Sequence, residues 1–385
     1  MIRRAYLDHN ATSPLRQEAR AAMLEALETL GNPSSVHAEG RAAKALLEDA
    51  RAAVARAIGG PRRGIVFTSG ATEAASLALS PWLRREGEAA PIEVLLVGAG
   101  EHLCVLQGHR FPREAVENVP LTAEGVISLQ ALEAALARRA GARAMLALQA
   151  VNNETGVIQP VAEAAALVHA ASGVVVCDAV QSVGRLETTF ATTDADILFF
   201  SSHKLGGPMG VGALAFRDDS LHVESPMLRG GGQEFGRRAG TENVAGIAGF
   251  AAALSAATAE LASEGARLAR LRDGLERQVL KIAPDTRIYG LGAPRAPNAS
   301  AFAIPGLAPR TMLMALDLEN VALSAGSACS SGKMMESHVL AAMGAAEKEA
   351  LRASFGWSST QEDVEQFGKV LAHVVDRMRS RQPAA

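Results

Sequence analysis

Short, uninterrupted runs of apolar residues recur along the first half of this chain, and stretches with helical spacing separate them. The runs occupy residues 65–67, 94–97, 145–148, 174–177 and 197–200. A strand that is apolar on both faces has to be covered on both faces, as in parallel sheets whose crossover connections are helices. Helical spacing at 129–138 and 162–171 supplies such connections. The sequence therefore predicts an α/β core around a mostly parallel sheet.

A second, smaller α/β unit is expected toward the C-terminus. Its expected elements are a bridging amphipathic helix, a strand and a helix at 262–282, 299–304 and 310–318. A last helix should begin after Thr360, because acids occupy its first turn and apolar residues follow at helical spacing. We divide the chain into a large domain, 1–258, whose N-terminal segment is free to pack with the small domain, and a small domain, 259–385.

Composition and charge argue against several classes of function. The net charge is −3 and 4% of the residues are aromatic, so the chain offers neither the basic surface nor the rings that nucleic-acid binding needs. The apolar run 244–259 is too short for a membrane span, and we expect a buried or subunit-interface helix there. The three cysteines, Cys104, Cys177 and Cys329, form no CxxC pair, and no apolar leader follows Met1. We therefore expect a cytoplasmic protein without a disulfide framework or a resident metal.

Two charged residues follow apolar runs, where a charge is costly unless it has a partner. Lys204 stands between such a run and Gly-Gly-Pro, which is not typical of a solvated surface lysine, and its amine can form a Schiff base with an aldehyde cofactor. Asp178 ends another run and can pair with a pyridinium nitrogen, although a helix N-cap would also explain it. Together they point to pyridoxal phosphate.

Several further residues fit such a cofactor. The segment 68–73 follows a predicted strand and opens a predicted helix, so its N–H groups and hydroxyls can bind phosphate, although a capping turn explains them as well. Ser201 and His203 can add phosphate contacts. Gln181 could reach the phenolic oxygen, and His102 could stack on the ring, although a lone histidine is more often structural.

Two residues suggest substrate chemistry. Cys329 lies among small residues at 324–332, where little apolar packing surrounds it, and an accessible thiol is a candidate nucleophile. The alternative is a buried packing cysteine, which is the commoner use. Arg352 can bind a carboxylate through two parallel hydrogen bonds, and the alternative for it is a surface salt bridge.

Taken together, the motifs of this chain resemble a known family, the NifS/IscS-type cysteine desulfurases among the class V aminotransferase-like pyridoxal phosphate enzymes. The resemblance extends from Tyr6 to about Gly356, nearly the whole chain. Besides the Lys204 and Cys329 segments, it includes the motifs at 31–37, 67–73, 151–156, 178–184, 230–234 and 238–243. It implies the fold type I architecture of these transferases, with a large sheet domain and a smaller C-terminal α/β domain.

The resemblance also implies a role for each matching residue. Catalytic roles fall to Lys204, which would bind the cofactor covalently, to His102 and to Cys329. Contacts with the cofactor are implied for Ala71, Thr72, His102, Asn153, Asp178, Gln181, Ser201, His203, Lys204 and, from the partner subunit, Thr241. The substrate would be held by Asn10, Asn153 and Arg352.

The reaction that the resemblance implies converts L-cysteine to L-alanine and leaves a persulfide on Cys329. A homodimer would then pass the sulfur to an iron–sulfur scaffold or a thiolation acceptor, and Cys329 could serve as a transient cluster ligand. The alternatives are a selenocysteine lyase, another class V aminotransferase-like enzyme, which would not need Cys329, or a non-catalytic partner subunit, which would lack Lys204 or Asp178.

Some positions depart from the usual family pattern. These departures are Ser202 in the lysine segment, Glu336 after the cysteine segment, and Trp357 near the end of the resemblance. Leu103 and Cys104 also differ from the usual pair after the histidine. We interpret Cys104 as a packing residue, and none of these positions belongs to the implied catalytic set.

Overall fold

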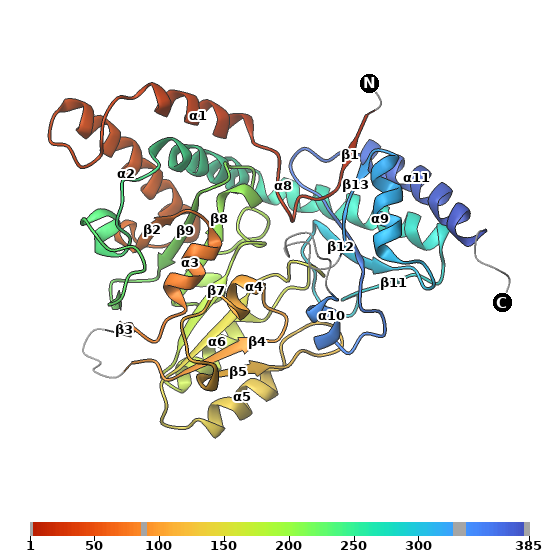
Figure 1. Cartoon of the computed structure of the whole chain (residues 1–385), viewed down its shortest axis with the longest axis horizontal. Coiled ribbons are helices and arrows are strands. Elements are labelled where there is room, and N and C mark those ends of the chain that lie inside the picture. Colours follow the sequence, from red (N-terminus) through yellow and green to blue (C-terminus); the bar gives the residue numbers. More distant parts are fainter. Residues whose placement is uncertain (1–2, 86–90, 326–335, 381–385) are drawn as a thin grey trace.

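The computed structural model of the chain describes residues 3–85, 91–325 and 336–380. Its large unit is built on a seven-stranded sheet (Figure 1). In spatial order the strands are β2 (Ile65–Thr68), β9 (Gly212–Phe216), β8 (Ile197–Ser201), β7 (Val174–Asp178), β6 (Ala144–Gln149), β4 (Val94–Gly98) and β5 (Val116–Val119). β9 is antiparallel to both of its neighbours, and the strands from β8 to β5 are parallel. All five predicted strands and the mostly parallel sheet are confirmed.

Helices cover both faces of this sheet, as the apolar runs predicted. Alternate residues of a strand point to opposite faces, so Leu146 and Leu148 join one core while Met145 and Ala147 join the other. The first core includes residues of α2 (Ala38–Ile58), α5 (Leu129–Arg138), α6 (Val161–Ala170) and α8 (Val244–Ile282). The second includes residues of α3 (Ala71–Ala78) and α4 (Leu103–Leu106).

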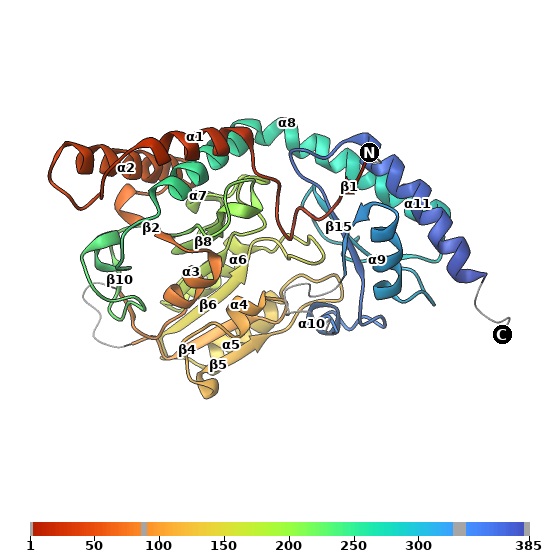
Figure 2. The ribbon, with the colours of Figure 1, turned by 45° about the horizontal axis from the view of Figure 1, so that its top comes forward.

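The longest helix, α8, runs along both units (Figure 2). Its first half packs on α1 (Gln17–Glu28) and α2 and contributes Phe250 and Leu254 to the core of the large unit. Its second half packs on α11 (Gln361–Arg379) and contributes Leu271 to the core of the small unit. By length and composition α8 could cross a membrane. Here its apolar side chains are instead divided between two protein cores.

The sequence predicted two helices in this region, at 244–259 and 262–282, and the structure joins them. The two residues between them, Glu260 and Leu261, are good helix formers, so nothing interrupts the helical hydrogen bonds. The domain division that we placed after residue 258 therefore falls inside a continuous helix, and the division stays a prediction.

The small unit is a four-stranded antiparallel sheet packed against helices. Its strands, in order, are β11 (Arg287–Ile288), β12 (Ala299–Ala303), β15 (Leu351–Ser354) and β14 (Ser324–Ala325). The predicted strand and helix are confirmed as β12 and α9 (Pro309–Leu318), and the predicted cap is confirmed, because the Thr360 N–H binds Asp363 at 2.7 Å before α11 begins. Further short elements include β3 (Leu83–Arg85), β10 (Leu221–Val223), α7 (Phe190–Thr193) and α10 (His338–Ala342).

The N-terminal segment joins the two units. β1 (Ala5–Tyr6) pairs with β13 (Val321–Ala322) beside the small sheet. His9 follows, fully buried, with its two ring nitrogens 3.2 Å from the hydroxyls of Ser13 and Ser359. Burial, followed by the charges of nearby arginines, lowers the pKa of His9 to about 3.

We expect His9 to make the protein less stable in mild acid. Because its pKa is about 3 when folded and near 6.5 when unfolded, the unfolded chain binds the extra proton, and stability falls as the pH drops below about 6.5. Between pH 7 and pH 5 this residue should remove about 2 kcal/mol from the free energy of unfolding. Denaturant unfolding at both pH values measures the loss, and a His9→Gln variant should lose less. Equal losses in the two proteins would contradict the assignment.

Candidate active site

The carboxyl ends of the large-sheet strands meet the N-terminal segment and β15 around a cavity of about 710 Å³. Ligands of open α/β sheets bind at this edge. The predicted site residues that line the cavity are Asn10, Ala71, Thr72, His102, Asn153, Asp178, Gln181, Ser201, His203, Lys204 and Arg352. The structure therefore brings together the predicted set except for Thr241 and Cys329, and Cys329 lies outside the described residues.

Asp178 is the last residue of β7 and is buried in the cavity wall. One of its carboxylate oxygens accepts the N–H of Val180 at 2.9 Å, which closes a turn, and no helix begins there, so the N-cap alternative is wrong. Burial raises the pKa of Asp178 to about 6, while the bond from Val180 and the charge of Lys204 act in the opposite direction. A buried acid of this kind fits a cationic ring nitrogen as its partner.

Lys204 ends a short 3₁₀ turn, Ser202–Lys204, that directly follows β8. Its amine donates to the main-chain oxygens of Asn10 and Ala11 at 2.7 and 2.8 Å. The turn therefore directs the amine into the cavity and not into solvent. The neighbouring His203 ring lies 3.1 Å from the hydroxyl of Thr12, and burial followed by the Lys204 charge lowers the pKa of His203 to about 4.

His102 both caps α4 and lines the cavity, so the structural and the functional interpretation hold together. Its Nδ1 accepts the N–H of Cys104 at 3.1 Å. Burial, followed by the charge of Lys204, lowers the pKa of His102 to about 4, so the ring is neutral at pH 7. Because Nδ1 accepts a hydrogen bond, the single ring proton is on Nε2.

The N-terminus of α3 offers a place for a phosphate group. Ala71 and Thr72 are its first residues and line the cavity, opposite Ser201 and His203 from β8 and the turn after it. A side chain could not replace Gly212 on the adjoining β9, because its Cβ would lie 2.7 Å from the main chain of Gly70. This close approach of two backbones brings the α3 N-terminus beside the end of β8.

Thr241 does not line this cavity within one chain. It lines a smaller neighbouring recess together with Thr68, Ser69 and Arg238. Arg238 in turn binds Glu73 of α3 at 2.9 Å, which connects the Thr241 segment to the phosphate end of the cavity. Its contribution from a partner subunit stays a prediction.

Arg352 lies on β15 and is buried, so the surface salt-bridge alternative is wrong. Its guanidinium donates to the carbonyl of Asn153 at 2.9 Å and to the carboxylate of Asp8 at 2.8 Å. Nε of Arg352 and Oδ1 of Asn153 are buried and have no hydrogen-bond partner within the described parts of the chain. Unpaired buried polar atoms in a cavity wall fit a polar ligand such as an amino acid.

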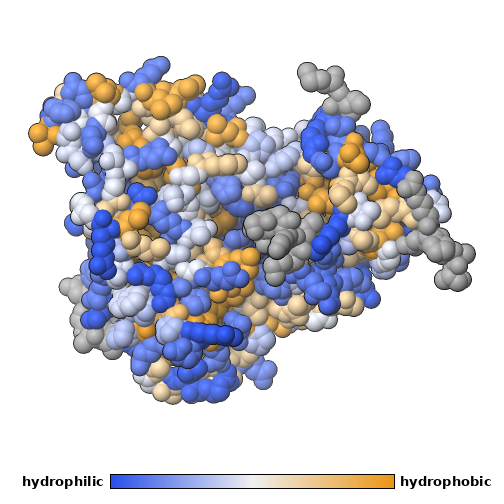
Figure 3. All heavy atoms as spheres, in the orientation of Figure 1, coloured by the Kyte–Doolittle hydropathy of each residue, from blue (hydrophilic) through white to orange (hydrophobic). Residues whose placement is uncertain are grey.

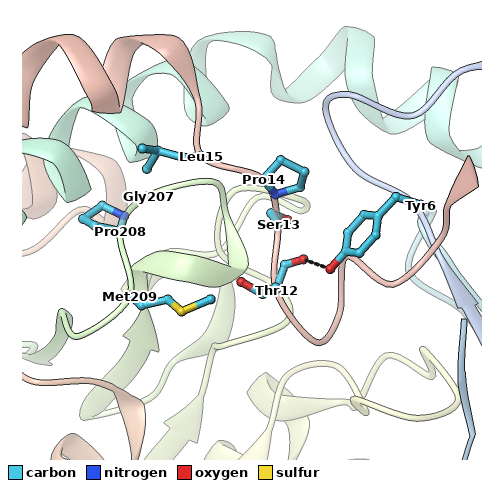
Figure 4. A pocket seen from close by; sticks show the side chains of 8 residues that line it. All are labelled: Tyr6, Thr12, Ser13, Pro14, Leu15, Gly207, Pro208 and Met209. Carbon is cyan, nitrogen blue, oxygen red and sulfur yellow. Dashed lines mark hydrogen bonds between the residues drawn. The ribbon is translucent and has the colours of Figure 1, made fainter. Parts of the chain in front are cut away.

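Sequence reasoning missed several residues that shape this site. Asp8 holds Arg352 and also accepts the hydroxyl of Ser324 at 2.7 Å. The resemblance begins at Tyr6 and so includes Asp8, but within this segment it implied a role only for Asn10. Tyr6 donates to the main-chain oxygen of Thr12 at 2.8 Å, at the edge of an adjoining recess (Figure 4).

Three of the positions that depart from the family pattern make contacts outside the cavity. Trp357 donates to the main-chain oxygen of Pro14 at 2.9 Å, and Arg16 lies over its ring at 5.5 Å. Ser202 is fully buried beside Gly207, and Glu336 forms an ion pair with Lys348 at 3.0 Å. These three departures do not line the cavity, whereas Cys104, another position that departs from the pattern, does.

Comparison with known proteins gives consistent matches over the full length. Residues 5–367 match the family Aminotransferase class-V. A curated relative named cysteine desulfurase, from Cereibacter sphaeroides, is 38% identical and aligns over 99% of this chain and 98% of its own length. The structure of a NifS-like protein from Rickettsia africae has a TM-score of 0.86 at 30% identity, covering 97% of this chain and 99% of that one. The structure of SspA in complex with cysteine has a TM-score of 0.75 at 26% identity, covering 92% and 100%.

Proposed function

The chain belongs to the class-V aminotransferase family, among its cysteine desulfurases, and we propose that it uses pyridoxal phosphate to convert L-cysteine to L-alanine, leaving the sulfur as a persulfide on Cys329. One observation carries the proposal. A buried acid, a lysine amine and an arginine, contributed by three distant segments, line the same cavity: Asp178, Lys204 and Arg352. A cysteine-bound neighbour of the same fold supports L-cysteine as the substrate.

The residues present fit the cofactor. Asp178 would hold its ring nitrogen, Gln181 its phenolic oxygen, and the α3 N-terminus with Ser201 and His203 its phosphate. When bound, pyridoxal phosphate withdraws electrons from the Cα atom of an attached amino acid and so eases loss of the Cα proton. The protein contributes the groups that hold the substrate and move that proton.

Two groups can move protons in this cavity. The Lys204 amine, once it is free and neutral, can accept the Cα proton, and the Asn10 and Ala11 carbonyls stabilise the ammonium that forms. The neutral His102 carries its proton on Nε2 and can donate it, because its Nδ1 is already engaged by the Cys104 N–H.

Sulfur transfer is assigned to Cys329. Its thiolate attacks the substrate sulfur, so that an S–S bond forms while the Cβ–S bond breaks and the electron pair returns to the substrate carbons. Protonation of those carbons gives L-alanine. The persulfide then passes to an acceptor, for which we propose an iron–sulfur scaffold or a thiolation enzyme.

We also propose that the enzyme is a cytoplasmic homodimer in which Thr241 completes the partner's phosphate site. The position of Thr241 in a recess apart from its own cavity supports this. So does the exposed apolar surface over α1 (Figure 3), where Leu24, Leu27 and the nearby Leu30 are 54%, 68% and 80% exposed.

Loss of the Arg352 side chain should weaken substrate binding. In an Arg352→Gln variant the KM for L-cysteine should rise about 10- to 100-fold, because charge-assisted bonds to the substrate carboxylate are lost. Steady-state kinetics measure this. Arg295→Gln is the matched control, since it removes an arginine with a largely covered side chain from an ion pair with Glu276 that lies outside the cavity. An unchanged KM in Arg352→Gln would contradict this role.

The test of the proposed function measures alanine and sulfide from L-cysteine, with added pyridoxal phosphate and a reductant. Equal amounts of both products, with extra sulfur mass on the peptide containing Cys329, are expected. Selenide release from L-selenocysteine that far exceeds sulfide release from cysteine would indicate a selenocysteine lyase instead. A yellow, cofactor-bound protein that makes no sulfide would overturn the proposal in favour of another aminotransferase-like activity. A non-catalytic subunit is disfavoured, since Lys204 and Asp178 are both present.

A further inference from the structure

Arg185 carries a charge in the interior for which the described part of the chain supplies no carboxylate. The residue is 7% exposed and follows β7 in the same run of turns as Gln181. Burial lowers the pKa of Arg185 to about 10, so the side chain remains protonated at pH 7. No ion pair to it occurs within residues 3–85, 91–325 and 336–380. A buried charge without a counter-charge is costly, which calls for an explanation.

All described hydrogen bonds of Arg185 go to uncharged oxygens around the cavity. One terminal nitrogen donates to Oε1 and to the main-chain oxygen of Gln181. The other donates to the main-chain oxygens of His9, at 3.1 Å, and Lys204, at 2.8 Å. One guanidinium therefore connects the turn after β7, the lysine turn and the N-terminal segment.

The contact with Gln181 fixes the orientation of its amide. An arginine side chain can only donate hydrogen bonds, so the amide oxygen of Gln181 must face Arg185. The NH₂ group is then on the other side, where one of its hydrogens binds the main-chain oxygen of Asn10 at 3.1 Å. Gln181 lines the cavity, so its second N–H is available to a ligand there. That N–H also carries a stronger dipole, because the amide oxygen is bound to a cation.

We propose that Arg185 is a positioning residue that holds the Gln181 amide with its NH₂ group toward an anionic oxygen of the bound cofactor and, through that amide, stabilises the anion. The inference rests on the proposed function, in which this oxygen is the phenolic oxygen of pyridoxal phosphate. Arg185 is not among the described residues that line the cavity. It acts through Gln181. Its hydrogen bond to the main-chain oxygen of Lys204 also fixes the lysine turn relative to Gln181.

The test is an absorbance titration of the bound cofactor in the absence of substrate. In Arg185→Lys the ammonium keeps the charge but cannot hold four oxygens in the planar geometry of a guanidinium. Weaker donation to the anionic oxygen makes the deprotonated form harder to reach, so the pH at which the absorbance changes should rise by about one unit. The matched control is Arg16→Lys. Arg16 is also buried, and it donates to the main-chain oxygen of Leu205, the residue after Lys204. It has no described hydrogen bond to Gln181, so Arg16→Lys should leave the titration unchanged.

Two further measurements separate a positioning role from a purely structural one. In a Gln181→Met background, Arg185→Lys should cause no additional shift, because the amide through which it acts is absent. A shift of the same size in that background would overturn the proposal. So would an Arg185→Lys protein that unfolds at a lower temperature while its titration stays unchanged.

The titration also distinguishes this inference from the function on which it rests. A wild-type protein that binds pyridoxal phosphate but makes no alanine from cysteine would refute the desulfurase activity. The absorbance titration of its bound cofactor, with and without Arg185→Lys, would still test the role of Arg185. A wild-type protein that takes up no pyridoxal phosphate would overturn both.

Discussion

Alanine formation from L-cysteine is expected to fall by at least about 1,000-fold when Lys204 is replaced by alanine. The amine of Lys204 lies in the cavity, held by the main-chain oxygens of Asn10 and Ala11. A methyl group can neither bind an aldehyde covalently nor accept the Cα proton. Single-turnover and steady-state alanine assays measure the loss, and reduction with borohydride followed by mass analysis shows whether the cofactor is still attached.

Two controls make the Lys204 experiment decisive. Lys369→Ala removes an exposed lysine of α11 and should keep the wild-type rate. Thermal unfolding of Lys204→Ala shows whether the variant is folded, which we expect because the main-chain oxygens of Asn10 and Ala11 that accept from this amine can bind water instead. A folded Lys204→Ala protein with more than about a tenth of the wild-type rate would contradict its role.

The second large effect is expected for Cys329→Ala, which should abolish the protein-bound persulfide and lower sulfide release by about 100-fold or more. The other two thiols are poor substitutes. Cys177 is fully buried in β7, and burial, followed by the charge of Asp178, raises the pKa of its thiol well above the ordinary value. A thiol that stays protonated is a weak nucleophile. Cys104 lines the cavity but is only 8% exposed.

The location of the persulfide distinguishes the three cysteines. Mass analysis of protein treated with L-cysteine should find the added sulfur on Cys329 in the wild type. Cys104→Ala should retain that label and most of the rate, in agreement with its interpretation as a packing residue. Persulfide on Cys104, or unchanged sulfide release from Cys329→Ala, would contradict the assigned nucleophile.

The strands were predictable because a sheet covered on both faces leaves continuous apolar runs. β9 was missed because Gly212 and Ala213 at its start give a weak apolar signal, although the strand fits there only because Gly212 approaches Gly70 so closely. α1 was missed because Leu24 and Leu27 stay exposed within this chain, so its apolar pattern does not mark a core face.

The site residues on strand ends were predictable for a different reason. Asp178 and Lys204 each follow an apolar run, and a charge at such a place draws attention in the sequence. Arg185 has no such signal. Its bond to His9 joins residues 176 positions apart, and nothing local to either residue indicates it. The contacts that set the site geometry therefore depend on how the N-terminal segment passes between the units.

The continuity of α8 has a mechanical consequence. A helix that passes without a break from one core to the other resists bending, because a hinge at its middle would break successive main-chain hydrogen bonds. The two units are thus held in a fixed relative orientation by a helix that belongs to both cores. We therefore expect the relative orientation of the two units to change little when the cavity is occupied.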